Sequence, residues 1–204
     1  MSILIGGIDE HGVYLAADKR AVNARTKAAE IEDAIKIHTV NDHIAVGVVG
    51  HYGVSQVLSE FLQWRTKENS ADRINSETFA DVQQVIQEMM MDITRQYQTI
   101  IEQRPFSVVL AGIDQNGEAL LSRWDSDGTQ RWRDMKNISS CRLLVLGPPD
   151  LPVEFCNHIA EQCVAMARTR GWPLLSAMTS TIGVLAAKSS QINDKVDTWT
   201  HRLP

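Results

Sequence analysis

The chain of 204 residues has 44% hydrophobic and 22% charged residues, the ordinary composition of a globular domain with a sizeable core. Its formal net charge of −5 excludes the broad positive field that attracts proteins to nucleic acid. No apolar run approaches the roughly 20 residues needed to cross a bilayer, and the first residues lack the pattern of a secretion signal. We expect one domain over residues 1–204, a cytoplasmic location, and neither nucleic acid nor a membrane as partner.

The chain contains three cysteines and no CxxC pair, at Cys141, Cys156 and Cys163. This odd number and this spacing argue against a disulfide framework and against a zinc site. We expect buried free thiols in a reducing compartment, and we expect neither a metal nor another cofactor.

The first half of the chain shows strand patterns followed by helix patterns. Pairs of apolar runs separated by polar turns predict four strands, at residues 3–8, 13–18, 34–40 and 44–49. Apolar residues at helical spacing then predict two amphipathic helices, over residues 54–62 and 79–97. Ser76 is the expected N-cap of the second helix, and Pro105 is expected to close it.

Strand patterns return in the second half, at residues 107–113, 118–124 and 142–146. Pro152 and Gly171 bound a third helix, with an inward face of Cys156, Ile159, Ala160, Cys163 and Ala167. A further strand is expected at residues 182–185. Because each element has one apolar face to cover, this order predicts two sheets packed together with helices outside.

Ser2 follows Met1 directly and precedes the first predicted strand. Many cytoplasmic proteins begin in this way, so an ordinary start is the simplest explanation of Ser2. If Met1 is removed, however, the strand beginning at Ile3 would hold the free amine and the hydroxyl of Ser2 in a fixed place. An α-amine, with a reference pKa of about 7.7 to 8.0, can act as the base for its own residue's hydroxyl. Ser2 is therefore the candidate nucleophile.

Two charged residues interrupt apolar strands. Asp18 ends one of them and needs a partner if it is buried. Lys36 lies where period-two alternation puts it on the face of Ala34 and His38, and an exposed place on the sheet is the ordinary explanation of such a lysine. In the functional hypothesis, Asp18 keeps Lys36 charged beside Ser2 and so favours loss of a proton from the nearby amine or hydroxyl.

Gly47 and Gly50 lie between a predicted strand and a predicted helix. Glycines let the backbone pass close to a ligand, and a free N–H at this point could hold a developing oxyanion. A tight strand-to-helix turn would explain the same glycines without any catalysis.

Taken together, these segments resemble the β subunits of the proteasome and the bacterial HslV peptidase. Residues 12–21 resemble their second-strand signature, an apolar strand that ends in Asp-x-Arg-Ala. Lys36-Ile37-His38 followed by Gly47-Val48-Val49-Gly50 resembles their lysine strand and glycine turn. Residues 104–114 and 125–129 match the pattern of their second sheet. The resemblance covers residues 2 to 130 in order and spacing.

The resemblance implies the α+β fold of the N-terminal nucleophile hydrolases, a four-layer αββα sandwich. It implies a peptidase that cleaves peptides or unfolded proteins through an acyl intermediate, inside a homo-oligomeric double ring; whether an ATP-dependent unfoldase assists stays open. Asp18, Lys36 and Gly47 match the family's acid, lysine and oxyanion glycine. Ser2 stands where the family usually has threonine, and it lacks the methyl group that restricts χ1.

The last third departs from this resemblance. Pro148 stands where the family has a supporting serine, and no Arg-Asp-x-x-Ser-Gly-Gly precedes residues 182–185. The hydroxyls in this region have no aspartate among them; they are Ser176, Thr179, Ser180 and Thr181. Two alternatives to a peptidase therefore stay open: a catalytically silent ring subunit with an assembly or binding role, and an amidohydrolase of small amides.

Overall fold

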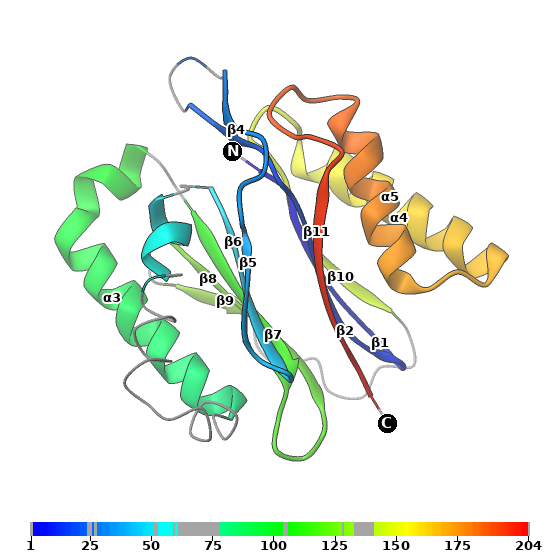
Figure 1. Cartoon of the computed structure of the whole chain (residues 1–204), viewed down its shortest axis with the longest axis horizontal. Helices are drawn as coiled ribbons and strands as arrows, with labels where there is room; N and C mark the ends of the chain where they lie inside the picture. The colour runs from blue at the N-terminus through cyan, green and yellow to red at the C-terminus, as the bar shows by residue number, and fades with distance from the viewer. Residues whose placement is uncertain are drawn as a thin grey trace.

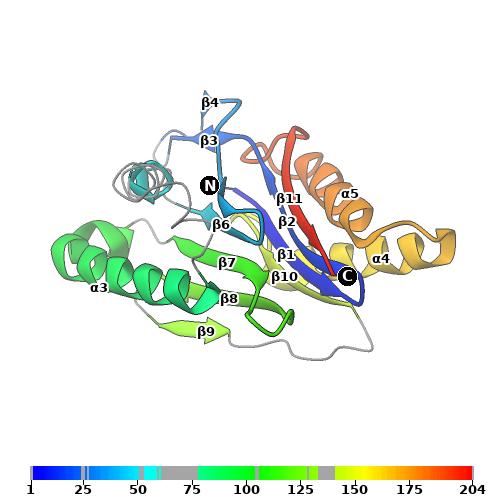
Figure 2. The same cartoon turned by 60° about the horizontal axis from the view of Figure 1, so that its bottom comes forward.

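The computed structural model describes residues 2–23, 26, 28–50, 53–58, 60, 78–103, 106–127, 129–132 and 141–203. Two antiparallel sheets lie face to face, and helices cover the outer face of each sheet (Figures 1 and 2). This is the α+β four-layer sandwich that the sequence predicted.

The first sheet has the strand order β10-β1-β2-β11. Its strands are β1 (Leu4–Asp9), β2 (Gly12–Asp18), β10 (Arg142–Leu146) and β11 (Val196–Arg202). The predicted hairpin of β1 and β2 is confirmed, with Leu4 opposite Ala17. Since β11 pairs with β2 and sets Val196 opposite Asp18, the last strand lies beside the end of the hairpin where the chain begins (Figure 1).

The second sheet has the order β5-β6-β7-β8-β9. Its strands are β5 (Ile37–Asn41), β6 (Ile44–Val49), β7 (Ser107–Ile113), β8 (Ala119–Asp125) and β9 (Gln130–Trp132). A small ribbon of β3 (Ala21–Val22) and β4 (Ala29–Ile31) connects the first sheet to the second. The four predicted strands that fall in this sheet are confirmed, with bounds shifted by a few residues.

Apolar side chains from both sheets fill the space between them, with Leu4, Leu15, Val109 and Leu121 fully buried. The outer face of the second sheet packs on α3 (Phe79–Gln103), and residues 53–58 are helical as predicted. Reciprocal hydrogen bonds between Thr78 and Asp81 begin α3. The expected cap Ser76 and the expected terminator Pro105 lie outside the described residues.

The outer face of the first sheet packs on α4 (Val153–Arg170) and α5 (Leu174–Ala186). The bounds predicted for α4 are confirmed: Pro152 precedes the helix, and Gly171 ends it in the left-handed conformation at φ 64°. Of its predicted inward residues, all but Ile159 are buried. The cysteines are free thiols, two of them buried and Cys141 half-buried.

The strand expected at residues 182–185 was wrong, because this run belongs to α5. Met178, Ile182 and Leu185 recur at helical spacing and are fully buried against the first sheet. An apolar run of four residues does not distinguish a strand from the buried side of a helix. The actual last strand is β11. None of the helices in the described part of the chain is long and apolar enough to span a membrane.

Candidate active site

Ser2 lies two residues before the start of β1 and is 4% exposed. The residue after it is bound to the end of β2 in both directions: the Ile3 N–H donates to Asp18 Oδ1 at 2.8 Å, and the Asp18 N–H donates to the Ile3 carbonyl at 3.2 Å. These bonds hold the start of the chain against the end of the neighbouring strand. Ser2 is therefore placed by the sheet, as expected for a residue whose main-chain and side-chain groups must lie in a fixed position.

Asp18 and Lys36 form a buried ion pair, with Lys36 Nζ 2.8 Å from Asp18 Oδ1. Asp18 is fully buried and Lys36 is 2% exposed, whereas the apolar side chain of Ile35 is 56% exposed. This reversal excludes the ordinary explanation of Lys36 as an exposed sheet residue. The main chain of Lys36 is fixed as well, because its carbonyl accepts a hydrogen bond from the Val48 N–H at 2.8 Å.

The carbonyl of Arg20 joins the pair to Ser2. It accepts a hydrogen bond from Lys36 Nζ at 2.6 Å and a long one from the Ser2 hydroxyl at 3.5 Å. The Arg20 N–H donates to Asp18 Oδ2 at 2.9 Å, so the carboxylate and the carbonyl are held in one short segment. Sequence reasoning gave Arg20 no role, because a contact through a main-chain carbonyl leaves no mark on residue type.

Burial determines the electrostatics of Lys36. Loss of water lowers the pKa of its ammonium from 10.5 to about 8, although the Asp18 carboxylate opposes this shift; the nearby Arg20 charge lowers the pKa further. Lys36 therefore presents a charge that is easily lost near the pH at which an α-amine also titrates. Such a pairing of groups is characteristic of sites that move protons.

Gly47 is the glycine that the resemblance pointed to as the oxyanion donor. Gly47 lies inside β6, opposite Ile37 on one side and Val109 on the other. The Ile113 N–H donates to the His43 carbonyl, and by alternation the amide of Gly47 also faces β7, where the ladder uses it. Packing requires a glycine at position 47, because a Cβ there would come within 2.8 Å of the Leu4 side chain.

Gly50 is the glycine at the end of β6, with φ 107°. Its amide falls on the same edge of β6 as that of Val48, which is bonded to Lys36. Among the described residues no acceptor is found for the Gly50 amide. Gly50 thus combines an amide without an acceptor among the described residues with a backbone conformation that favours glycine.

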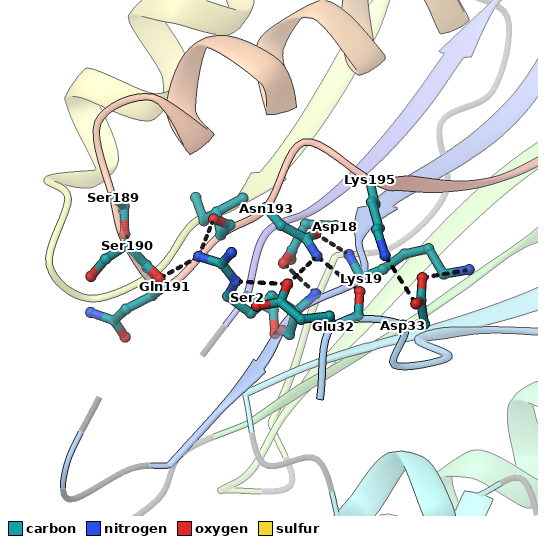
Figure 3. A network of polar contacts seen from close by, with 12 residues as sticks. Ser2, Asp18, Lys19, Glu32, Asp33, Ser189, Ser190, Gln191, Asn193 and Lys195 are labelled. Carbon is teal, nitrogen blue, oxygen red and sulfur yellow. Dashed lines mark hydrogen bonds and ion pairs between the residues drawn. The ribbon is translucent and has the colours of Figure 1, made fainter. Parts of the chain in front are cut away.

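The loop of residues 187–195, between α5 and β11, lies against this site (Figure 3). Asn193, the Lys195 carbonyl and the Arg20 side chain make contacts between the loop and the end of β2, and the Lys195 carbonyl accepts a hydrogen bond from the Lys19 N–H at 3.1 Å. Ser189 donates to Asp150 Oδ2 at 2.7 Å and so ties the loop to the turn that contains Pro148. Its contacts with the end of β2 join residues more than 150 positions apart, and the sequence gave no signal of them.

The hydroxyls that the sequence offered from the last third lie on α5. Thr179 donates to the Ser176 carbonyl and Thr181 to the Ala177 carbonyl, so both bond back to their own helix. In the described part of the chain, no group of three or more His, Cys, Asp or Glu side chains could hold a metal ion.

Comparison with known proteins shows the family of the chain. The family model described as "Proteasome subunit" matches residues 2–135. Proteasome subunit alpha 2 of Haloarcula marismortui is 31% identical over 127 residues, covering 61% of this chain and 49% of the relative. A proteasome subunit alpha of Halobacterium salinarum is 26% identical over 132 residues, covering 63% and 49%. The match thus spans about half the length of these curated relatives.

Two solved structures share the fold over nearly the whole chain. The eukaryotic HslV from Trypanosoma brucei superposes with a TM-score of 0.61 at 14% identity, covering 97% of this chain and 98% of that one. The Anbu (ancestral beta-subunit) from Yersinia bercovieri superposes with a TM-score of 0.70 at 11% identity, covering 98% and 81%. At these identities the likeness concerns the fold alone, whereas the family model covers well over half of the sequence. The chain therefore belongs to the proteasome subunit family.

Proposed function

We propose that this proteasome-like subunit is a peptidase whose nucleophile is the Ser2 hydroxyl, exposed together with its α-amine when Met1 is removed. The observation that carries the proposal is the convergence of Ser2 and the buried Lys36 on one carbonyl oxygen, that of Arg20. Apolar side chains would fill the same space at lower cost than a buried ion pair, so the 2% exposure of Lys36 beside a serine hydroxyl supports a chemical role.

In the first half of the reaction, Ser2 Oγ attacks the carbonyl carbon of the peptide while its proton passes to the Ser2 α-amine. The positive charge of Lys36 favours alkoxide character on Oγ, and Asp18 holds Lys36 in place. The C–N bond then breaks, and the leaving amine takes the proton from the α-ammonium. Water hydrolyses the resulting ester, giving a proton to the α-amine, which returns it to Oγ as the acid product leaves.

The oxyanion of the tetrahedral intermediate needs a donor on the far side of the carbonyl from Ser2. The amide of Gly50 supplies it, because it lies at the end of β6, two residues beyond the partner of Lys36. Gly50 accepts a positive φ at no steric cost, which any other residue would resist. One such donor contributes about 3 kcal/mol to the stability of the transition state.

Subunits of this family typically form rings. Our proposal extends this to a homo-oligomeric double ring in the cytoplasm, built from one domain over residues 1–204, that admits peptides or unfolded proteins. Light scattering on the purified protein tests the assembly. A species that stays monomeric at micromolar concentration would contradict the ring.

A second function is favoured by a specific observation. The relatives detectable by sequence are named α subunits, the non-catalytic class of the family, and Pro148 offers no hydroxyl to the site. A catalytically silent subunit with an assembly or binding role would keep the fold and the buried pair. An amidohydrolase of small amides would share the mechanism and differ in its pocket.

Two mass measurements separate these functions. Protein purified from its native cells is expected to lack Met1, because serine is small enough to permit removal of the methionine. The processed protein is expected to form a covalent adduct at Ser2 with an electrophilic peptide that traps an N-terminal hydroxyl, whereas protein that retains Met1 is not. A native mass that includes methionine, or a processed and folded protein that forms no adduct, would favour the silent subunit. An adduct only with small amides would favour the amidohydrolase.

A further inference from the structure

The loop of residues 187–195 buries polar side chains where it lies against the end of β2. Ser189, Gln191 and Asn193 are each no more than 5% exposed. This loop lies beyond residues 2–135, the part of the chain that the family model matches. Figure 3 shows Asn193 reaching from the loop toward Lys19 and Glu32.

Asn193 binds two separate segments with one side chain. Its Oδ1 accepts a hydrogen bond at 2.9 Å from the Lys19 N–H, a donor that it shares with the Lys195 carbonyl at 3.1 Å. Its Nδ2 donates to the Glu32 carbonyl and to Glu32 Oε2, each at 3.0 Å. Asn193 thereby joins the loop before β11, the residues that follow β2 and the residues that precede β5. Asp18 ends the strand before the first of the last two segments, and Lys36 belongs to the second.

Glu32 extends this connection to Arg20. The Arg20 Nε donates to Glu32 Oε2 at 3.2 Å, and its Nη1 donates to the Ser190 carbonyl at 2.8 Å and the Ile192 carbonyl at 3.2 Å. The hydrogen bond from Asn193, and then that from Arg20, hold the pKa of Glu32 below its ordinary value, so the carboxylate stays charged. The side chain of Arg20 is thus fixed by the loop, while its main chain is fixed by Asp18.

We infer that Asn193 is a positioning residue: by binding the Lys19 amide and Glu32, it fixes residues 18–20 so that the Arg20 carbonyl receives both Lys36 and Ser2. The inference rests on the proposed function, since positioning has a chemical purpose only if Ser2 reacts. Asn193 can influence the site because its contact with the Lys19 amide lies close to the contact between Lys36 and the Arg20 carbonyl. The 2.6 Å bond between Lys36 and the Arg20 carbonyl lies one residue from the amide that Asn193 holds, and small displacements of reacting groups cost large factors in rate.

Loss of Asn193 would change the pKa of Lys36. The charged groups that face Lys36 are Asp18, from the end of β2, and Arg20, from the residues after it. Burial is the main reason for the lowered pKa of Lys36. If residues 18–20 move apart from Lys36, water enters and the pKa rises toward its ordinary value. The Lys36 ammonium is then less precisely placed beside the Ser2 hydroxyl, and the reaction of that hydroxyl with an electrophile slows.

The test compares Asn193→Ala with the matched control Lys195→Ala in the full-length, processed protein. Lys195 lies in the same loop, but its side chain makes only an exposed ion pair with Asp33. The titration of Lys36 is followed by NMR of lysines labelled with ¹³C at Cε; the chain has seven lysines, and Lys36→Arg assigns the signal. In Asn193→Ala we expect the pKa of Lys36 to rise by about one unit and the rate of adduct formation at Ser2 to fall about tenfold. Lys195→Ala should change neither.

A rescue experiment separates positioning from general stability. Asn193→Asp keeps the acceptor for Lys19 but sets a carboxylate against Glu32, so it should raise the pKa of Lys36 as Asn193→Ala does. Adding Glu32→Gln restores a donor opposite position 193 and should return the Lys36 titration to that of the wild type. If Asn193→Ala does not fold, the comparison of Asn193→Asp with and without Glu32→Gln still tests the positioning role of Asn193.

The inference is overturned if Lys36 titrates as in the wild type in Asn193→Ala or Asn193→Asp, or if Glu32→Gln brings no recovery. The NMR titration needs no activity. A processed wild type that forms no adduct would therefore refute the proposed function, while the titration would still decide the role of Asn193.

Discussion

Replacing Lys36 by methionine removes a buried charge while keeping the length of the side chain. The fully buried Asp18 carboxylate would lose its Nζ donor and keep two backbone donors, the amides of Ile3 and Arg20. Removing one partner of a buried pair costs about 3 to 5 kcal/mol, and the two remaining hydrogen bonds place the loss at the lower end, about 3 kcal/mol. In a domain of this size each kcal/mol corresponds to about 2–4 °C, so Tm should fall by roughly 6–12 °C.

The matched control is Lys19→Met. The Lys19 side chain makes only a partly exposed ion pair with Asp33 at 3.9 Å, and such pairs contribute less than about 1 kcal/mol. Both variants and the wild type are melted at one protein concentration, because assembly makes Tm depend on concentration. Adduct formation at Ser2 is followed in parallel on the processed proteins.

We expect Lys36→Met to lower Tm and to slow adduct formation by about a hundredfold or more, and we expect Lys19→Met to do neither. Equal melting of the two variants would show that the burial of Lys36 does not matter to the fold. Equal adduct formation by Lys36→Met and wild type, with both folded, would refute the role of Lys36 in activating Ser2.

Three further predictions follow from the same geometry. Because burial lowers the pKa of Lys36 from 10.5 to about 8, the unfolded chain binds more protons than the native chain between these pH values. The unfolding free energy of wild type relative to Lys36→Met should therefore rise with pH, by up to about 3 kcal/mol between pH 8 and 10.5, measured by urea titration; a flat difference would contradict the lowered pKa. Gly47→Ala should destabilise the protein by about 1–3 kcal/mol, since its Cβ would meet Leu4 between the sheets. Gly183→Ala, on an open face of α5, should instead stabilise it by about 1 kcal/mol. Equal changes in Tm for the two glycine variants would argue against the packing of Gly47 on Leu4. Ser2→Ala should abolish adduct formation yet change Tm by less than about 2 °C, because the Ser2 hydroxyl makes only a long 3.5 Å hydrogen bond.

The sequence predicted those parts of the site that depend on strand alternation and on charge. Asp18 and Lys36 stood out because charged residues interrupt apolar strands, and their pairing follows from the need to compensate a buried charge. Gly47 and Gly50 could not be told apart in this way. Which of two glycines keeps a free amide depends on the register of β6 against its neighbours, and residue type does not encode that register.

The last third of the chain was the least predictable from sequence. Gly171 and Pro173 leave a short break between α4 and α5, and the apolar residues of α5 contain a run that also suits a strand. Asn193 contacts Lys19 across 174 positions. Polar residues in a loop usually indicate exposure. No local pattern therefore predicts that Asn193 is buried and hydrogen-bonded through both Oδ1 and Nδ2.

The Asp18–Lys36 pair and the Ser2 hydroxyl differ in how well they distinguish a peptidase from an inactive subunit. Once a fold contains Asp18 and Lys36, loss of either leaves the other charge uncompensated in the interior, so a subunit without activity would still be held to both. Ser2 is under no such constraint, because its hydroxyl contributes one long hydrogen bond to a carbonyl that Lys36 already satisfies. Its α-amine becomes a base only when Met1 is gone. The distinction between a peptidase and a silent ring subunit therefore lies in the chemical state of Ser2, and the mass of the processed chain with and without an electrophile reads that state directly.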